Sequence, residues 1–157
     1  MGWVSRGDDR RSTLDVLPKI STAFDALYLS LWCQQHIPAA VLELCRLRLA
    51  QLHRCDLETQ RQECAISDDK RENLVRWDTH GSFSAPERAC LAFTEVYAMD
   101  AQALTDAQAD DVKEHFSEAG LVLLIEALGI FDGMTRLSLL WQLPAKSAAE
   151  NVSEPAP

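Results

Sequence analysis

The sequence predicts an all-α domain, an antiparallel bundle of about six to eight helices. Alanine and leucine dominate every long segment and β-branched residues are sparse, so propensity and hydrophobic periodicity both favour helix over strand. The length, 157 residues, is usual for one domain with its own core. We expect that domain over residues 14–143, with a flexible arm over residues 1–13 and a disordered tail over residues 144–157.

The first two long helices are predicted from apolar residues at helical spacing. One is expected to begin at Ser21, which is a good N-cap, and to end near Gln35. Pro38 suits a first turn and is expected to open the second helix, which runs to about His53. Most faces of this second helix are apolar, so we expect it to lie at the centre of the domain.

A shorter helical region is predicted to follow. Residues 54–65, RCDLETQRQECA, are expected to be helical, either continuing the second helix or restarting after a kink near Cys55. Ser67 is expected to cap a short helix that ends near Trp77, and the residues DTHGS then form a turn.

The remaining helices are predicted from their start signals. In a capping box, a Ser or Thr is followed three residues later by Glu or Gln, which satisfies backbone donors at a helix start. Two such boxes are present, Ser84 with Glu87 and Thr105 with Gln108. The last long helix is expected to begin after Ser117, to end near Gln142 and to be closed by Pro144.

The composition argues against several partners and locations. A formal net charge of −9 repels phosphate backbones, so no nucleic-acid partner is expected. No apolar run reaches the roughly 18 residues that a membrane-spanning helix needs. Residues 1–12 lack the apolar core of a secretory signal. We therefore expect a cytoplasmic protein with no membrane partner.

No cofactor and no metal ion are expected. The six glycines form no phosphate-binding loop, and the four histidines lack the spacing that zinc or iron sites need. The cysteines are odd in number, which argues against a disulfide framework. Four of the five lie in helical apolar patterns that favour reduced, buried thiols, namely Cys33, Cys45, Cys64 and Cys90.

Residues 37–55, IPAAVLELCRLRLAQLHRC, carry a family resemblance. They resemble the core motif of the alkylhydroperoxidase D and carboxymuconolactone decarboxylase superfamily, in which E-L-x-R-L-x-x-A precedes C-x-x-C-x-x-x-H. The matching residues are Glu43, Arg46, Leu47, Ala50 and Cys55, the last at the place of the first cysteine. The stretches FSAPERACLAFTEVYA and HFSEAGLVLLIEALGIFDGMTRLSLLW also fit, so the resemblance covers roughly residues 20–143 and implies the fold of that superfamily.

The resemblance also implies a site, in altered form. In active alkylhydroperoxidases the second cysteine attacks the peroxide, the first resolves it as a disulfide, and the glutamate and histidine move protons. Here Glu58 stands at the place of the second cysteine and Gln62 at that of the histidine. The candidate catalytic residues are therefore Glu43, Cys55, Glu58 and Gln62, and a C-x-x-C disulfide is impossible.

The same residues can be interpreted without the family. If residues 55–62 are helical, Cys55, Glu58 and Gln62 share one face. The neighbouring His53 and Arg54 would lower the pKa of the Cys55 thiol, whereas Glu58 would raise it unless a cation neutralises this carboxylate. Cys55 is thus either a functional thiol or an inert, partly buried one, and Arg61 is the cation that could neutralise Glu58.

Glu43 lies in the helix expected to be central. A partly buried carboxylate needs a partner, so Glu43 either pairs with an arginine such as Arg46 or Arg136 or transfers protons. Along one straight helix Glu43 and Cys55 would lie about 18 Å apart. They can meet only if the chain bends between them.

Three functions follow from these observations. The resemblance implies a divergent thiol-dependent peroxidase or antioxidant protein that uses a single cysteine on a small peroxide. The first alternative is a catalytically degenerate oligomeric scaffold or small-molecule binding module. The second is a decarboxylase-like enzyme that acts on a small carboxylate or lactone without a redox cysteine pair. In all three a homo-oligomer, either a dimer, a trimer or a hexamer, is expected, because nearly all-apolar helices suit subunit burial.

Overall fold

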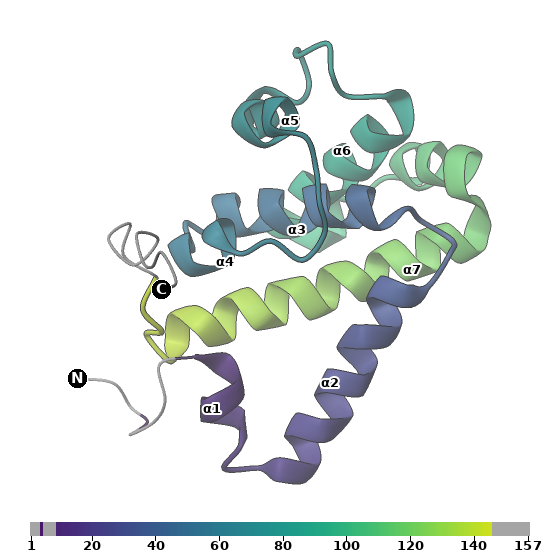
Figure 1. Ribbon diagram of the computed structural model, residues 1–157. Helices are drawn as coiled ribbons and strands as arrows, with labels where there is room; N and C mark the ends of the chain where they lie inside the picture. Colours follow the sequence, from purple (N-terminus) through teal and green to yellow (C-terminus); the bar gives the residue numbers. More distant parts are fainter. Residues whose placement is uncertain (1–3, 5–8, 146–157) are drawn as a thin grey trace, which may run out of the picture.

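The computed structural model describes residue 4 and residues 9–145, and these are all-α, with seven α-helices, two short 3₁₀ helices and no strand (Figure 1). This confirms the predicted class. The other parts of the expected arm and tail, residues 1–3, 5–8 and 146–157, lie outside the described residues. The helices are α1 (Arg10–Leu14), α2 (Pro18–Cys33), α3 (Ala39–Leu52), α4 (Asp56–Gln60), α5 (Asp68–Asn73), η1 (Leu74–Arg76), α6 (Ala85–Asp100), η2 (Ala101–Ala103) and α7 (Asp106–Leu140).

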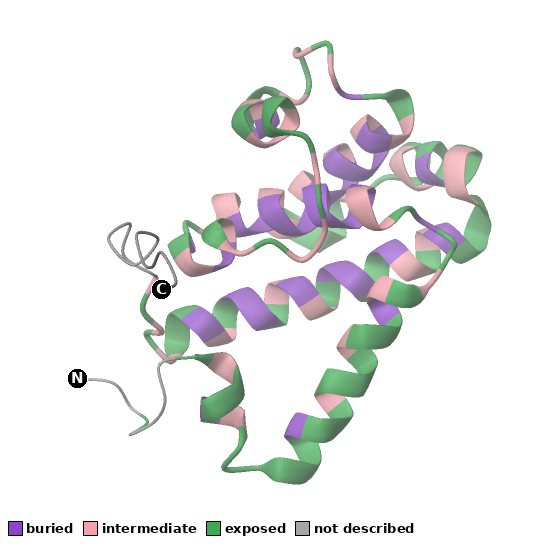
Figure 2. Cartoon of the chain, viewed as in Figure 1, coloured by how far each residue is buried: buried purple, intermediate pink, exposed green. Residues whose placement is uncertain are grey.

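Helix α3 lies at the centre, as its apolar sequence predicts, and packs against both α6 and α7. Buried residues line α3 and one side of α7, whereas α2 projects from the bundle and is exposed along most of its length (Figures 1 and 2). No helix of the described residues is long and apolar enough to cross a membrane. The main core cluster contains Leu31, Ile37, Val41, Leu42, Cys45, Leu49, Ala89, Cys90, Phe93, Val112, Leu124, Ala127, Leu128 and Phe131.

The helix starts mostly follow the sequence. Three predicted caps are present: Ser67, Ser84 with Glu87, and Thr105 with Gln108. The expected start at Ser21 is wrong, because α2 begins with Pro18 in its first turn and the buried Ser21 hydroxyl instead donates to Asp15 at 3.1 Å. The end of the expected N-terminal arm forms α1, whose start is capped by the side chain of Asp9.

The last two predicted helices are joined into α7, with a kink at Ser117 (φ 63°, ψ 178°). A non-glycine residue rarely adopts this conformation. The kink lies at the place where the sequence predicts a helix boundary, so the boundary exists as a change of direction within α7.

The chain turns sharply between α3 and α4. Arg54 adopts a positive φ of 55°, and the Cys55 N–H donates to the Ala50 carbonyl at 2.9 Å, which closes α3. Of the two possibilities that the sequence leaves open, a continuing helix or a restart near Cys55, the structure shows the restart. Helix α4 ends at Gln60, however, so the expectation that Gln62 shares a helical face with Cys55 and Glu58 is wrong.

Candidate functional site

A buried ion pair on α3 forms the centre of the site. The side chains of Glu43 and Arg46 are only 0% and 2% exposed. Arg46 donates from Nε to Glu43 Oε2 at 2.8 Å and from Nη2 to Glu43 Oε1 at 2.9 Å. This bidentate ion pair supplies the partner that the buried Glu43 carboxylate needs. Of the two arginines expected as partners, Arg46 is the one used, and Arg136 instead pairs with Asp132.

Arg46 also fixes α4 onto α3. Its Nη1 donates to the Glu58 carbonyl at 2.9 Å and lies 3.5 Å from Glu58 Oε2, and its Nη2 donates to the Arg61 carbonyl at 2.7 Å. Because the chain reverses at Arg54, Glu43 and Glu58 come to the same guanidinium although 15 residues separate them. Arg46 is thus the hub of the site.

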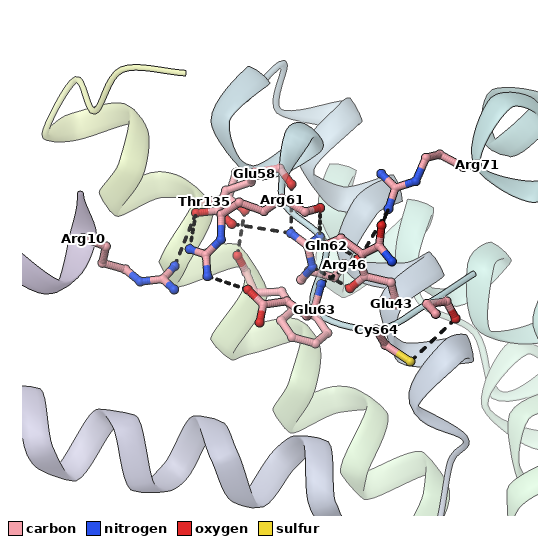
Figure 3. Close-up of polar contacts among 12 residues, drawn as sticks. Arg10, Glu43, Arg46, Glu58, Arg61, Gln62, Glu63, Cys64, Arg71 and Thr135 are labelled. Carbon is pink, nitrogen blue, oxygen red and sulfur yellow. Dashed lines mark hydrogen bonds and ion pairs between the residues drawn. The ribbon is translucent and has the colours of Figure 1, made fainter. Parts of the chain in front are cut away.

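Glu58, at the place of the family's second cysteine, has partners from α7, from α1 and from the segment after α4. Ser138 on α7 donates to Glu58 Oε1 at 2.8 Å. Arg10 on α1 and Arg61 after α4 lie 3.3 and 3.7 Å from the same oxygen. Sequence reasoning identified Arg61 but missed Ser138 and Arg10. Arg10 reaches the network from α1 (Figure 3).

The residues that follow α4 contact the Glu43 carboxylate. The Glu63 N–H donates to Glu43 Oε1 at 3.2 Å, and Arg71 lies 4.0 Å from the same oxygen. Gln62 is exposed and accepts from Arg71 at 3.5 Å. Of the four candidate residues, Glu43 and Glu58 therefore meet in the buried network, whereas Gln62 lies at its edge (Figure 3).

Cys55, the fourth candidate, is 2% exposed and lies at the N-cap of α4. Burial raises the pKa of its thiol, and the nearby Glu58 charge acts in the same direction. The lowering expected from His53 and Arg54 does not prevail, because His53 binds Asp132 at 2.7 Å and Arg54 is exposed. The thiolate form of Cys55 is therefore disfavoured.

The other four cysteines differ in exposure, and all are free thiols. Cys45 and Cys90 are buried in the core as expected, where a mutual hydrogen bond and burial raise the pKa of Cys90. The expectation of buried thiols is wrong for the exposed Cys33 and the half-buried Cys64. Cys64 also lies outside any helix.

The network has a distinctive charge balance. Four guanidinium groups face three carboxylates, giving a formal charge of +1 within a protein whose net charge is −9. Among the described residues, no three Cys, His, Asp or Glu side chains are grouped so that they could hold a metal ion. Such a network favours an anionic or acceptor-bearing ligand over a cation.

Two aromatic residues of α2, Tyr28 and Trp32, lie near the network. The pKa of Tyr28 is raised to about 12, mainly by burial and further by the charge of Glu63. The Trp32 ring contacts the Tyr28 ring edge-on, and it packs against the Phe131 ring of α7 with the two ring planes tilted by 32°. The network therefore borders an aromatic surface.

No protein-family model and no curated protein match the sequence. Solved structures match over most of the chain. The debrominase Bmp8 in its apo form is 17% identical, with a TM-score of 0.77 over 88% of this chain and 77% of that chain. A Cys-to-Ala variant of Bmp8 in complex with 2,3,4-tribromopyrrole gives a TM-score of 0.75, with the same identity and coverage.

A third match is a protein of unknown function from Agrobacterium tumefaciens, for which a role in antioxidant defence as an AhpD protein has been suggested. It is 16% identical, with a TM-score of 0.74 over 85% of this chain and 95% of that chain. Sequence identities of 16–17% support a shared fold and nothing more about this chain. The chain adopts the AhpD-like helical fold that the sequence resemblance implied.

Proposed function

We propose that this protein is a non-redox member of the AhpD-like fold that binds a small molecule beside a fixed, buried ion-pair network. The observation that carries the proposal is the state of Glu58. Its side chain is 2% exposed and is held by Arg46, Arg10 and Ser138. A carboxylate tied in this way cannot replace an attacking thiol, so the network has a positioning role.

A single-cysteine peroxidase is less well supported. Peroxide is attacked by a thiolate that the solvent can reach. Cys55 is buried, and its pKa is raised rather than lowered. A peroxide would have to reach this thiol through the packed start of α4.

Acid-base catalysis on a small carboxylate or lactone is also less well supported. A general base needs an oxygen within hydrogen-bond reach of the substrate proton. Both Glu43 oxygens accept from Arg46, and both Glu58 oxygens face arginines. Small-molecule binding without such chemistry is consistent with the fold, because the Bmp8 variant of the same fold holds tribromopyrrole.

The test compares the reactivity of the five native thiols. In a short iodoacetamide pulse at pH 7, followed by mass spectrometry of each cysteine, we expect Cys55 to be labelled more slowly than the exposed Cys33, because Cys55 is buried and its raised pKa leaves less of the reactive thiolate. The rate at Cys55 is expected to rise with pH. Consumption of hydrogen peroxide with dithiothreitol as reductant should be the same for the wild type and Cys55→Ser.

The opposite pattern would refute the non-redox proposal. Cys55 would then be labelled as fast as Cys33, peroxide would block that labelling, and Cys55→Ser would abolish peroxide consumption. The protein would in that case be a single-cysteine peroxidase.

We further propose that the protein is a homo-oligomer that uses the exposed face of α2. Ile20 and Leu27, seven residues apart on one face, are 57% and 51% exposed. Exposed apolar side chains aligned in this way favour burial against a second subunit.

Leu27→Glu is expected to shift the wild-type oligomer to monomers in size-exclusion chromatography with light scattering. Leu29→Glu is the matched control, because Leu29 is 64% exposed on the opposite side of α2. A monomeric wild type, or equal effects of the two variants, would exclude this interface.

A further inference from the structure

Helix α1 is joined to the buried network through Arg10. Its Nη1 lies 3.3 Å from Glu58 Oε1, and the two side chains are 11% and 2% exposed. Among the described residues, this contact is the only hydrogen bond or ion pair that ties α1 to a helix other than α2. A helix of five residues is not stable in isolation, so α1 depends on such contacts.

The Arg10 guanidinium also lies against two aromatic rings of α2. Its central carbon is 5.9 Å from the Phe24 centroid and 5.7 Å from the Tyr28 centroid, which is within the range of a cation–π contact. The two rings stack on each other, with planes 13° apart. Arg10 therefore connects the Glu58 carboxylate to one side of α2, and a change in the surroundings of Phe24 can reach Glu58 through a single side chain.

Phe24 belongs to the apolar side of α2 that we assign to subunit contact. Ile20, Phe24 and Leu27 follow one another at helical spacing, i, i+4 and i+7. Ile20 and Leu27 are exposed, whereas Phe24 is half-buried. Because α2 projects from the bundle, this side is open to a second subunit (Figure 1). A subunit that covers both Ile20 and Leu27 also covers Phe24, which lies between them.

This side of α2 is suited to contact with a second copy of itself. Ile20 and Leu27 are equally far from the midpoint between Ala23 and Phe24. In an antiparallel pair of α2 helices related by a two-fold axis, Ile20 comes level with Leu27 of the partner subunit, and Phe24 comes level with the partner's Ala23. Such a contact uses the same patch on both subunits. The small, exposed Ala23 leaves room for a phenylalanine ring.

We propose that Arg10 couples subunit assembly to the buried network. A second copy of the chain covers Phe24 and excludes water from the Arg10 guanidinium beside it. Two opposite charges attract more strongly where water is excluded, so assembly strengthens the contact between Arg10 and Glu58. Arg10 is thus a positioning residue that acts on Glu58. The coupling rests on the proposed α2 interface and states how that interface acts on the network.

The test measures the subunit dissociation constant of the full chain by sedimentation velocity over a dilution series. Because coupling between two sites is reciprocal, Glu58→Gln is expected to raise this constant about fivefold or more. Glu58 is 2% exposed, so this change removes no atom from the subunit contact itself. Glu95→Gln is the matched control, since Glu95 on α6 is also paired with an arginine, Arg48, at 2.6 Å. It should leave the constant unchanged.

Two variants of α1 show whether Arg10 carries the effect. Arg10→Met should raise the dissociation constant as much as Glu58→Gln does, and in an Arg10→Met background Glu58→Gln should have no further effect. A purely structural role of Glu58 would instead weaken assembly equally with and without Arg10. Arg11→Met should leave the constant unchanged, because Arg11 is 78% exposed. The comparison of Arg10→Met with Arg11→Met decides the question even if Glu58→Gln does not fold.

The coupling and the interface can fail separately. Equal dissociation constants for the wild type and Arg10→Met, in an assembly that Leu27→Glu breaks, would overturn the coupling and keep the α2 interface. A monomeric wild type, or an assembly that Leu27→Glu leaves intact, would overturn both. Neither result bears on the non-redox proposal, which the labelling of Cys55 tests.

Discussion

Arg46→Met is expected to lower the free energy of unfolding by about 3–5 kcal/mol, as is usual when one partner of a buried ion pair is removed. Methionine fills much of the volume of the arginine side chain but neutralises none of the charge. Glu43 and Glu58, 0% and 2% exposed, would keep their burial and lose the guanidinium that both face. Two backbone carbonyls, those of Glu58 and Arg61, would also lose a donor. Urea denaturation followed by circular dichroism measures the change.

Arg48→Met is the matched control, two residues further along α3. Arg48 pairs with Glu95 at 2.6 Å, but the two side chains are 13% and 25% exposed. Removing a partly exposed ion pair typically costs about 1 kcal/mol or less. If Arg46→Met is as mild as Arg48→Met, the buried network does not hold α4 in place.

A triple variant separates charge from packing. Arg46→Met combined with Glu43→Gln and Glu58→Gln leaves no uncompensated charge, and buried ion networks can often be replaced by neutral groups at little cost. We expect the triple variant to recover most of the stability that Arg46→Met loses. A triple variant as unstable as Arg46→Met would assign the loss to packing instead.

The local part of the site could be predicted from the sequence. Glu43 and Arg46 are three residues apart on one helix, so their pairing follows from helical geometry. The restart near Cys55 could be predicted only as one of two possibilities, because the sequence alone does not distinguish it from a continuing helix. The angle of the turn could not, since it depends on the positive φ of Arg54, a residue type that rarely adopts this conformation.

The long-range part of the site could not be predicted. Arg10 and Ser138 reach Glu58 across 48 and 80 residues of sequence, and no pattern in either segment marks that contact. The sequence favours helix through residues 55–62, which would place Gln62 on one face with Cys55 and Glu58. The Arg61 carbonyl and the Glu63 N–H instead bind Arg46 and Glu43, and these tertiary bonds outweigh the helical preference of the segment.

Gly120→Ala is expected to destabilise the protein by about 1–3 kcal/mol, the usual penalty for overpacking. Gly120 lies three residues after the kink of α7 at Ser117. A Cβ at this position would overlap Phe116 Cβ and would lie 3.7 Å from Ile37 Cγ1. Because Phe116 Cβ is attached directly to the backbone, no side-chain rotation relieves the overlap, and the kink itself would have to open. This cost exceeds the gain of up to about 1 kcal/mol that alanine normally brings to a helix.

Gly133→Ala on the same helix is the control and should have the opposite sign. No atom lies within 4 Å of a Cβ at Gly133, which is exposed. The helix propensity of alanine should therefore stabilise the protein by roughly 0.5–1 kcal/mol, visible as a higher Tm. The kink directs α7 so that Phe131 contacts Trp32 and Ser138 contacts Glu58. If Gly120→Ala also raises the Tm, the close approach at the kink is not required, and neither is the glycine that permits it.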